Sequence, residues 1–145
     1  MKLLHIGCGN IRPPIFINTD KDEMDISKPW PYEDRSVDGI VSMCVFQCLT
    51  WKELIFAFKE SYRVLKAGGV MRMGVVLEDT LQPLDTFLYG NNINLFSFDL
   101  LKRVLLYIVG YDSITWCKYR ESAIPLLGKM DNRHGRGTSY LEVIK

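Results

Sequence analysis

Short apolar runs alternate with helically spaced apolar residues along this chain, and this alternation predicts an α/β protein. The runs Leu3–Ile6 and Ile15–Ile17 predict two short strands near the N-terminus, and Val37–Met43, rich in β-branched residues, predicts a longer buried one. Between them Met24–Ile26 is expected to form a very short strand. Pro29–Tyr32 contains two prolines and is expected to be loop.

The middle of the chain predicts a strand–helix–strand unit. Thr50-Trp51-Lys52-Glu53 matches a capping box, in which a threonine and a glutamate three residues later satisfy the first amides of a helix. Apolar residues then recur at helical spacing: Leu54, Ile55, Phe58, Tyr62 and Leu65. Gly68-Gly69 is expected to end this helix. Val70–Leu77 is expected to form the following strand.

The last third of the chain predicts one helix and two strands. Ser97 is positioned to cap a helix over Phe98–Val109, which Gly110 ends. Ser113–Tyr119 and Ser139–Ile144 are expected to pair as antiparallel strands. Residues 78–95 have no clear period, and the pattern leaves open whether they form a substrate-facing lid or a covering loop.

The connection between the first two strands is too short for a helix and contains Pro13-Pro14. Parallel neighbours usually need a crossover of about a dozen residues. We therefore expect the linker to run extended between parallel strands. The resulting fold class is a reduced Rossmann-like α/β domain over residues 1–145. Its sheet is mostly parallel, with a C-terminal antiparallel pair and no helix between the first two strands.

Composition excludes several classes of function. The chain has 145 residues, 48% hydrophobic and 24% charged, with a net charge of +1, so no global field favours nucleic acid or an anionic membrane. No apolar run is long enough to span a bilayer, and no signal-peptide pattern precedes Leu3, so a cytoplasmic location is expected. The four cysteines form no C-x-x-C pair, and no metal site is expected.

Candidate chemistry lies just after the first two strands. Gly7 and Gly9 allow a sharp turn and close backbone approach to a ligand, and Asp20 is placed to accept hydrogen bonds from a ribose diol. A dinucleotide fingerprint would need a third glycine, where this chain has Arg12, and a helix behind it. A nicotinamide-dependent enzyme is therefore disfavoured. No G-K-[ST] sequence is present, so a P-loop is excluded.

S-adenosylmethionine suits these residues better, because it carries no pyrophosphate. Its amino-acid part needs close backbone approach, and its ribose needs an acid. Its adenine needs apolar walls and a polar contact, for which Asp25, Ile26 and the loop Pro29–Tyr32 are candidates.

Several motifs resemble class I S-adenosylmethionine-dependent methyltransferases of the short methyltransferase-11-like kind. These motifs are Leu3–Asn10, Asn18-Thr19-Asp20, Asp25–Asp34, Ser36–Ile40, Tyr62–Gly69 and Ser139–Lys145. The run Arg63–Gly69 is the most specific match, with Ala67 in place of the family's proline. The resemblance spans nearly the whole chain.

The resemblance implies a cofactor site and an activity. Gly7, Cys8, Gly9 and Asn10 would line the methionine part, and Asp20 would hold the ribose. Asp25 and Ile26 would flank the adenine, and Ser42, Met43 and Cys44 would face the side of methyl transfer. The implied activity is methyl transfer to a small or medium acceptor. No catalytic base is identified, because positioning the acceptor in line with an activated sulfonium supplies most of the effect.

Two further expectations concern activity and assembly. Gln47-Cys48-Leu49 stands where many relatives carry Glu-His-Leu, so a catalytically degenerate member acting as a binding or partner subunit is the alternative function. The missing helix is expected to leave apolar surface exposed, which favours a homodimer.

Overall fold

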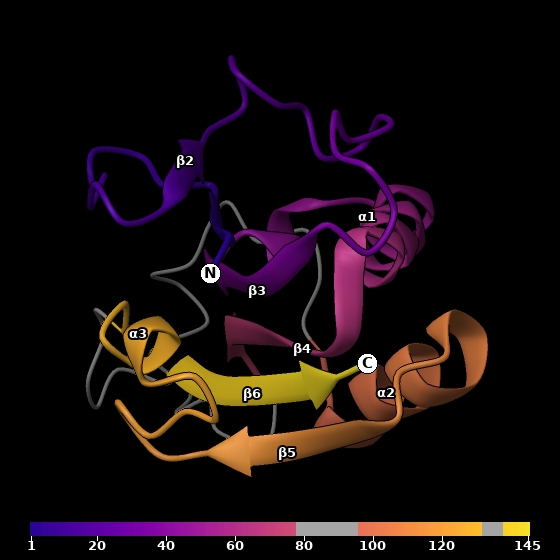
Figure 1. Ribbon diagram of the computed structural model, residues 1–145. Helices are drawn as coiled ribbons and strands as arrows, with labels where there is room; N and C mark the ends of the chain where they lie inside the picture. The colour runs from indigo at the N-terminus through magenta and orange to yellow at the C-terminus, as the bar shows by residue number, and fades with distance from the viewer. Residues whose placement is uncertain (78–95, 132–137) are drawn as a thin grey trace.

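One six-stranded sheet forms the centre of the computed structural model, which describes residues 1–77, 96–131 and 138–145 (Figure 1). The strand order is β2-β1-β3-β4-β6-β5. The strands are β1 Leu3–Ile6, β2 Ile17–Thr19, β3 Val37–Met43, β4 Leu65–Val76, β5 Ser113–Cys117 and β6 Thr138–Ile144. Strands β1 to β4 pair in parallel, and β6 runs antiparallel to both β4 and β5. The expected reduced Rossmann-like fold with a C-terminal antiparallel pair is confirmed.

Helix α1, Trp51–Val64, packs on one face of the sheet together with α2, Phe98–Arg103. The predicted capping box is present, because Thr50 Oγ1 accepts from the Glu53 amide and Glu53 accepts from the Thr50 amide. The predicted helix over 98–109 is confirmed as helical, but its second half, Val104–Val109, is a π-helix that ends at Gly110. Ser97 caps it as expected.

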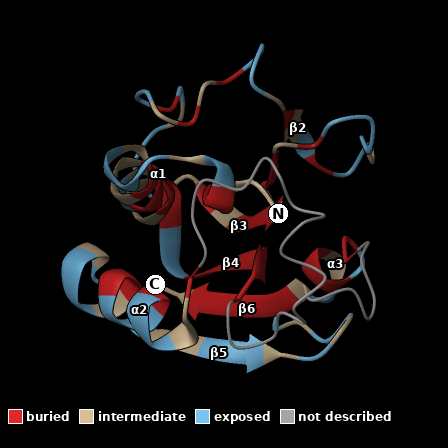
Figure 2. Cartoon of the chain, turned by 180° about the vertical axis from the view of Figure 1, so that it is seen from behind, coloured by how far each residue is buried: buried red, intermediate tan, exposed pale blue. Residues whose placement is uncertain are grey.

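The larger core lies between this helical layer and the sheet, and a smaller core lies on the opposite face (Figure 2). The short helix α3, Pro125–Gly128, covers part of that second face, which the sequence pattern did not predict. The buried side chains of the second core are Leu3, Phe16, Val41, Val70, Leu127 and Met130.

The first connection contains no helix, as predicted, but it is a series of turns rather than an extended run. It returns the chain so that Leu4 lies opposite Ile17 in a parallel pair. Phe16 is buried and packs edge-on against His5, with ring centroids 6.0 Å apart. The Asn18 side-chain amide donates to the carbonyl oxygens of Pro13 and Phe16. The Phe16 ring and the Asn18 side chain therefore hold this helix-free connection in place.

Three local predictions were wrong. Strand β2 begins at Ile17 instead of Ile15. Met24–Ile26 forms turns instead of a strand, because the Asp25 carboxylate accepts from both the amide and the hydroxyl of Ser27. Helix α1 ends at Val64 before the Gly68-Gly69 pair, because Leu65 is already extended and pairs with Val37 at the start of β4.

Arg63 fixes the loop that precedes β3 onto α1. Its guanidinium binds the Glu60 carboxylate through two contacts of 2.8 Å, and it also donates to the carbonyl oxygens of Trp30 and Tyr32. A further contact of 2.7 Å joins it to Asp34. Arg63, the first residue of the most specific sequence match, therefore ties the loop before β3 to helix α1.

Candidate functional site

The carboxyl ends of β1 and β2 bring the glycine turn and Asp20 together. Gly7 follows β1 and Asp20 follows β2, so the parallel pairing of the strands places both at one edge of the sheet. The Cys8 amide extends the ladder by donating to the Thr19 carbonyl oxygen at 3.1 Å. The Gly9 amide then donates to Asp20 Oδ2 at 3.0 Å. The Asp20 carboxylate therefore faces the glycine turn.

A cavity of about 310 Å³ opens beside Asp20, which is within the range of small-molecule sites. Four residues predicted from the sequence line it, namely Gly7, Asp20, Asp25 and Ile26. Eight more complete its wall: Ile6, Lys21, Met24, Ser27, Val45, Cys48, Leu49 and Glu53. The cavity thus combines an apolar wall with three carboxylates and one lysine.

The glycine turn depends on two left-handed backbone positions, and the two differ in their surroundings. Gly7 has a φ of +64°, and a Cβ atom there would lie 2.3 Å from Val45 Cγ2. Gly9 has a φ of +51°, but a Cβ atom there would meet no other heavy atom within 4 Å. Gly7 is required for close packing of the turn against Val45, whereas the space beside Gly9 is open to a ligand.

Both Asp20 oxygens accept hydrogen bonds from the main chain. Oδ2 accepts from Gly9, and Oδ1 accepts from the Lys21 amide at 2.8 Å. An ionised carboxylate has about four lone-pair sites, so capacity remains on both oxygens for hydroxyl donors of a ligand. Asp20 is thus held in a fixed orientation and can still bind.

Asp25 is held in its ionised form on the cavity wall. The Ser27 hydroxyl donates to its Oδ1 at 2.6 Å and the Ser27 amide at 3.0 Å. These bonds, with Lys28 nearby, lower the pKa of Asp25 to about 2. It presents a hydrogen-bond acceptor at neutral pH.

Helix α1 supplies a third carboxylate. Glu53 lines the cavity, and its Oε2 accepts from the Thr50 amide and hydroxyl at 2.8 and 2.7 Å. These bonds lower the pKa of Glu53. The sequence reasoning missed Glu53 as a wall residue, although the capping box placed it at the start of the helix that follows β3. Val45, Cys48 and Leu49 were missed too, and their position just after a strand that reaches the same sheet edge was the available signal.

The structure does not place the other six predicted residues on the cavity wall. Cys8, Gly9 and Asn10 lie on the turn beside it. Ser42 is fully buried on β3, and its hydroxyl has no partner among the described residues. Met43 lies against Gly74, where a Cβ atom would meet its sulfur at 2.7 Å. Cys44 has a left-handed backbone, with a φ of +60°, and its amide donates to the Gly74 carbonyl oxygen.

Other sequence candidates are structural or lie outside the described residues. His5 is buried and bonded to Asn18, and burial lowers its pKa. The loop Pro29–Tyr32, a candidate adenine wall, lies against α1 instead and buries Trp30. Glu78 and Asp79, the candidate lid 78–95, Arg133 and Arg136 fall outside the described residues. Among the residues that are described, no cluster could hold a metal ion and no helix is long and apolar enough to cross a membrane.

Comparison with known proteins finds one family model that matches less than half of the chain. Residues 11–73 match a family model described as a methyltransferase domain. A comparison with curated proteins gives no match.

Solved structures with the same fold include several that are described as S-adenosylmethionine-dependent methyltransferases. One from Thermotoga maritima, described as a possible histamine N-methyltransferase, has a TM-score of 0.69 and 16% identity over 99% of this chain and 82% of that one. One from Archaeoglobus fulgidus has a TM-score of 0.65 and 14% identity over 99% and 86% of the two chains. One from Methanosarcina mazei has a TM-score of 0.65 and 14% identity over 99% and 92%. At such identities the likeness establishes the fold.

Proposed function

We propose that this chain is a class I S-adenosylmethionine-dependent methyltransferase that binds S-adenosylmethionine in the cavity beside Asp20, and its fold and the family match over residues 11–73 support this. We further propose that it transfers the methyl group to a small or medium acceptor. The observation that carries the proposal is the contact of 3.0 Å between the Gly9 amide and the Asp20 carboxylate at the cavity edge. It brings the glycine turn that follows β1 next to the carboxylate that follows β2, at the sheet edge where a nucleoside-bearing amino acid would bind.

The cavity fits such a cofactor in size and in donor chemistry. Asp20 keeps accepting capacity for a ribose diol, and the open space at Gly9 allows close approach of a ligand to the main chain. Met24, Ile26 and Leu49 supply apolar wall for a base, and Asp25 supplies an acceptor beside them. Three carboxylates against one lysine suit a ligand that carries a positive charge.

The residues of this chain would act by binding and orientation. The bound cofactor would supply a methyl group already activated on a sulfonium, so no side chain has to activate it. Asp20 would fix the sugar, and Gly7 and Gly9 would hold the amino-acid part against the turn. The acceptor would be aligned from the open side of the cavity, and alignment alone provides much of the rate enhancement.

Calorimetric titration with S-adenosylmethionine and with its demethylated product tests the proposal. We expect binding in the micromolar range for both ligands. Asp20→Ala should lose most of the binding heat, because the sugar loses its acceptor. Asp22→Ala is the matched control, since Asp22 is an exposed acid two residues further along and does not line the cavity. It should bind like the unchanged protein.

Failure of both ligands to bind to the folded protein would contradict the proposal. In that case the chain would be a degenerate member, and co-purification with a second chain would support a role as partner subunit. The location in the cytoplasm stays a prediction from the sequence.

We also propose that the chain forms a homodimer through the surface left by the missing helix. Ile11, Ile15 and Ile17 lie on or beside β2 and are 48%, 54% and 39% exposed. Large exposed apolar side chains that gather on one surface favour association.

A further inference from the structure

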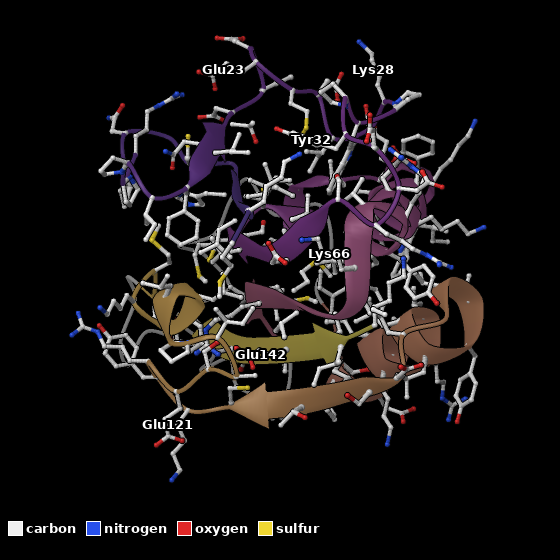
Figure 3. All side chains as sticks on the ribbon, viewed as in Figure 1. Glu23, Lys28, Tyr32, Lys66, Glu121 and Glu142 are labelled. Carbon is white, nitrogen blue, oxygen red and sulfur yellow. The ribbon has the colours of Figure 1, made fainter. Side chains whose placement is uncertain are left out.

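An ion pair bridges the turn after β1 and the turn after β2. Arg12 Nη1 lies 2.6 Å from Glu23 Oε1, and Arg12 Nη2 lies 3.0 Å from Glu23 Oε2. Two parallel contacts of this kind fix the relative orientation of a guanidinium and a carboxylate. Figure 3 labels Glu23 on the loop that follows β2, on the outer side of the molecule.

Both partners of the ion pair also bond to the candidate cofactor site. Arg12 Nε donates to the Gly9 carbonyl oxygen at 3.2 Å. The Asp20 amide donates to Glu23 Oε2 at 2.7 Å. Since the Gly9 amide donates to Asp20, the four residues Gly9, Arg12, Glu23 and Asp20 form a closed ring of hydrogen bonds.

The Ile11 amide also donates to the Cys8 carbonyl oxygen at 2.9 Å, but little side-chain packing holds this part of the turn. Residues 9 to 12 are all exposed, and the first apolar anchor after the turn is Phe16. In a complete dinucleotide-type fold, a helix would begin here and its packing would fix the glycine turn. This chain has no helix between β1 and β2, and Arg12 stands where the third glycine of that fingerprint would be.

Resting on the function proposed above, we propose that Arg12 and Glu23 are positioning residues that hold the Gly9 turn and Asp20 in the geometry that binds the cofactor. The ring replaces the missing helix by tying the turn to the acid directly. Arginine is required, because its planar fork reaches the carboxylate twice while Nε reaches a carbonyl oxygen, which a lysine ammonium cannot do.

This role differs from a contribution to stability. The side chains of Arg12 and Glu23 are 43% and 45% exposed, and exposed ion pairs add little to the free energy of unfolding. The ring orders only the two short turns that carry Gly9 and Asp20. Its loss should therefore change cofactor affinity and leave the melting temperature close to that of the unchanged protein.

The test compares Arg12→Gln, Arg12→Lys, Glu23→Gln and the double variant Arg12→Gln/Glu23→Gln. Titration with S-adenosylmethionine should show each single variant binding about five- to tenfold more weakly, roughly one decade in affinity. The double variant should bind no more weakly than the weaker single, because both changes open one ring. Multiplied losses in the double variant would overturn the proposal, since they indicate independent effects.

The matched control is Arg103→Gln. Arg103 pairs with Asp99 at 2.8 Å on α2, with side chains 71% and 70% exposed. This variant removes an exposed arginine–carboxylate pair that lies outside the cavity wall and should leave affinity unchanged.

Amide exchange at Gly9, measured by NMR on the protein without cofactor, separates this proposal from the proposed function. Opening the ring should speed exchange of the Gly9 amide in Arg12→Gln and not in Arg103→Gln. If the unchanged protein binds no cofactor but Gly9 exchange responds, the proposed function is wrong, and the ring of hydrogen bonds still orders the Gly9 turn. If the cofactor binds equally well to Arg12→Gln and Gly9 exchange is unchanged, the positioning role of Arg12 and Glu23 is wrong and the proposed function is unaffected.

Discussion

Single residues around the cavity serve either packing or binding. Of the two glycines in the turn, Gly7 serves packing and Gly9 leaves space for a ligand. Gly7 is enclosed by Val45, whereas the Cβ position of Gly9 is open. A sequence pattern treats both as flexible turn residues, because it records the absence of a side chain and not what surrounds it. The distinction depends on Val45, which is 38 positions away in sequence and reaches Gly7 only through the pairing of β1 with β3.

We predict that Gly7→Ala destabilises the protein more than Gly9→Ala. A left-handed backbone costs an alanine about 1–2 kcal/mol at either position. Gly7→Ala adds the clash with Val45, and overpacking of this kind costs about 1–3 kcal/mol more. Urea unfolding measures both. The double variant Gly7→Ala/Val45→Ala should recover part of the added loss, and equal losses for the two single variants would contradict the structure.

Arg72 carries the second residue-scale prediction, because it is fully buried on β4. It binds Asp131 through contacts of 2.8 and 2.6 Å and Glu142 at 2.9 Å, and it donates to the carbonyl oxygens of Lys118 and Glu121. Figure 3 shows Glu142 on β6 within the molecule and Glu121 pointing outward. We expect Arg72→Met to lower the free energy of unfolding by about 3–5 kcal/mol, because two buried carboxylates lose their only cationic partner among the described residues and keep main-chain donors.

Arg103→Met provides the comparison for Arg72→Met. Arg103 pairs with Asp99 where both are exposed, so its loss should cost well under 1 kcal/mol. Similar unfolding free energies for the two variants would show that the Arg72 network is not a buried anchor. The sequence pattern placed Arg72 within a strand but assigned it no role, since its partners come from segments 46 to 70 positions away.

At the scale of elements, the sequence predicted helices and strands well where all the residues that determine an element lie in one short stretch. Thr50 and Glu53 specify the start of α1, and the β-branched run specifies Val37–Met43 to the residue. Boundaries set by tertiary pairing were predicted poorly. Leu65 continues the helical spacing of α1, yet it leaves the helix because its backbone pairs with Val37. The wall residues Val45, Cys48 and Leu49 were also missed, because only the pairing of the strands brings them beside Asp20.

The capping box of α1 gives a prediction about pH. Thr50→Ala should lower the free energy of unfolding by about 1 kcal/mol, the usual cost of losing a threonine N-cap.

Glu53 has a lowered pKa in the folded protein, so its stabilising contribution is complete above its ordinary value of 4.5 and disappears as the pH falls through its folded pKa. The difference in melting temperature between the unchanged protein and Glu53→Gln should therefore shrink as the pH is lowered from neutral to about 3. A melting-temperature difference that does not change with pH would show that the Glu53 carboxylate does not stabilise the capping box.

At the scale of the whole molecule, the residues that the structure describes cover the two faces of the sheet unequally. Helices α1 and α2 enclose the larger core, while the other face carries α3, Phe16 and the Arg72 network. The sequence predicted the parallel sheet and the absent helix, but not that a short helix and a buried ion-pair network would cover the second face. That cover depends on residues 118–131, for which the sequence pattern predicted no helix.

The uneven cover underlies the last prediction, which concerns assembly. The segment around β2 is largely exposed in Figure 2, and Ile15 projects from it with 54% of its surface accessible. If this surface joins two copies, light scattering should give twice the mass of the chain, and Ile15→Lys should shift the protein to monomer by placing a charge in an apolar contact. Ile108→Lys is the matched control, since Ile108 is 52% exposed on the π-helical segment that contacts β5 at the other end of the sheet. A monomer at high concentration, or equal disruption by both variants, would remove the β2 surface as the interface.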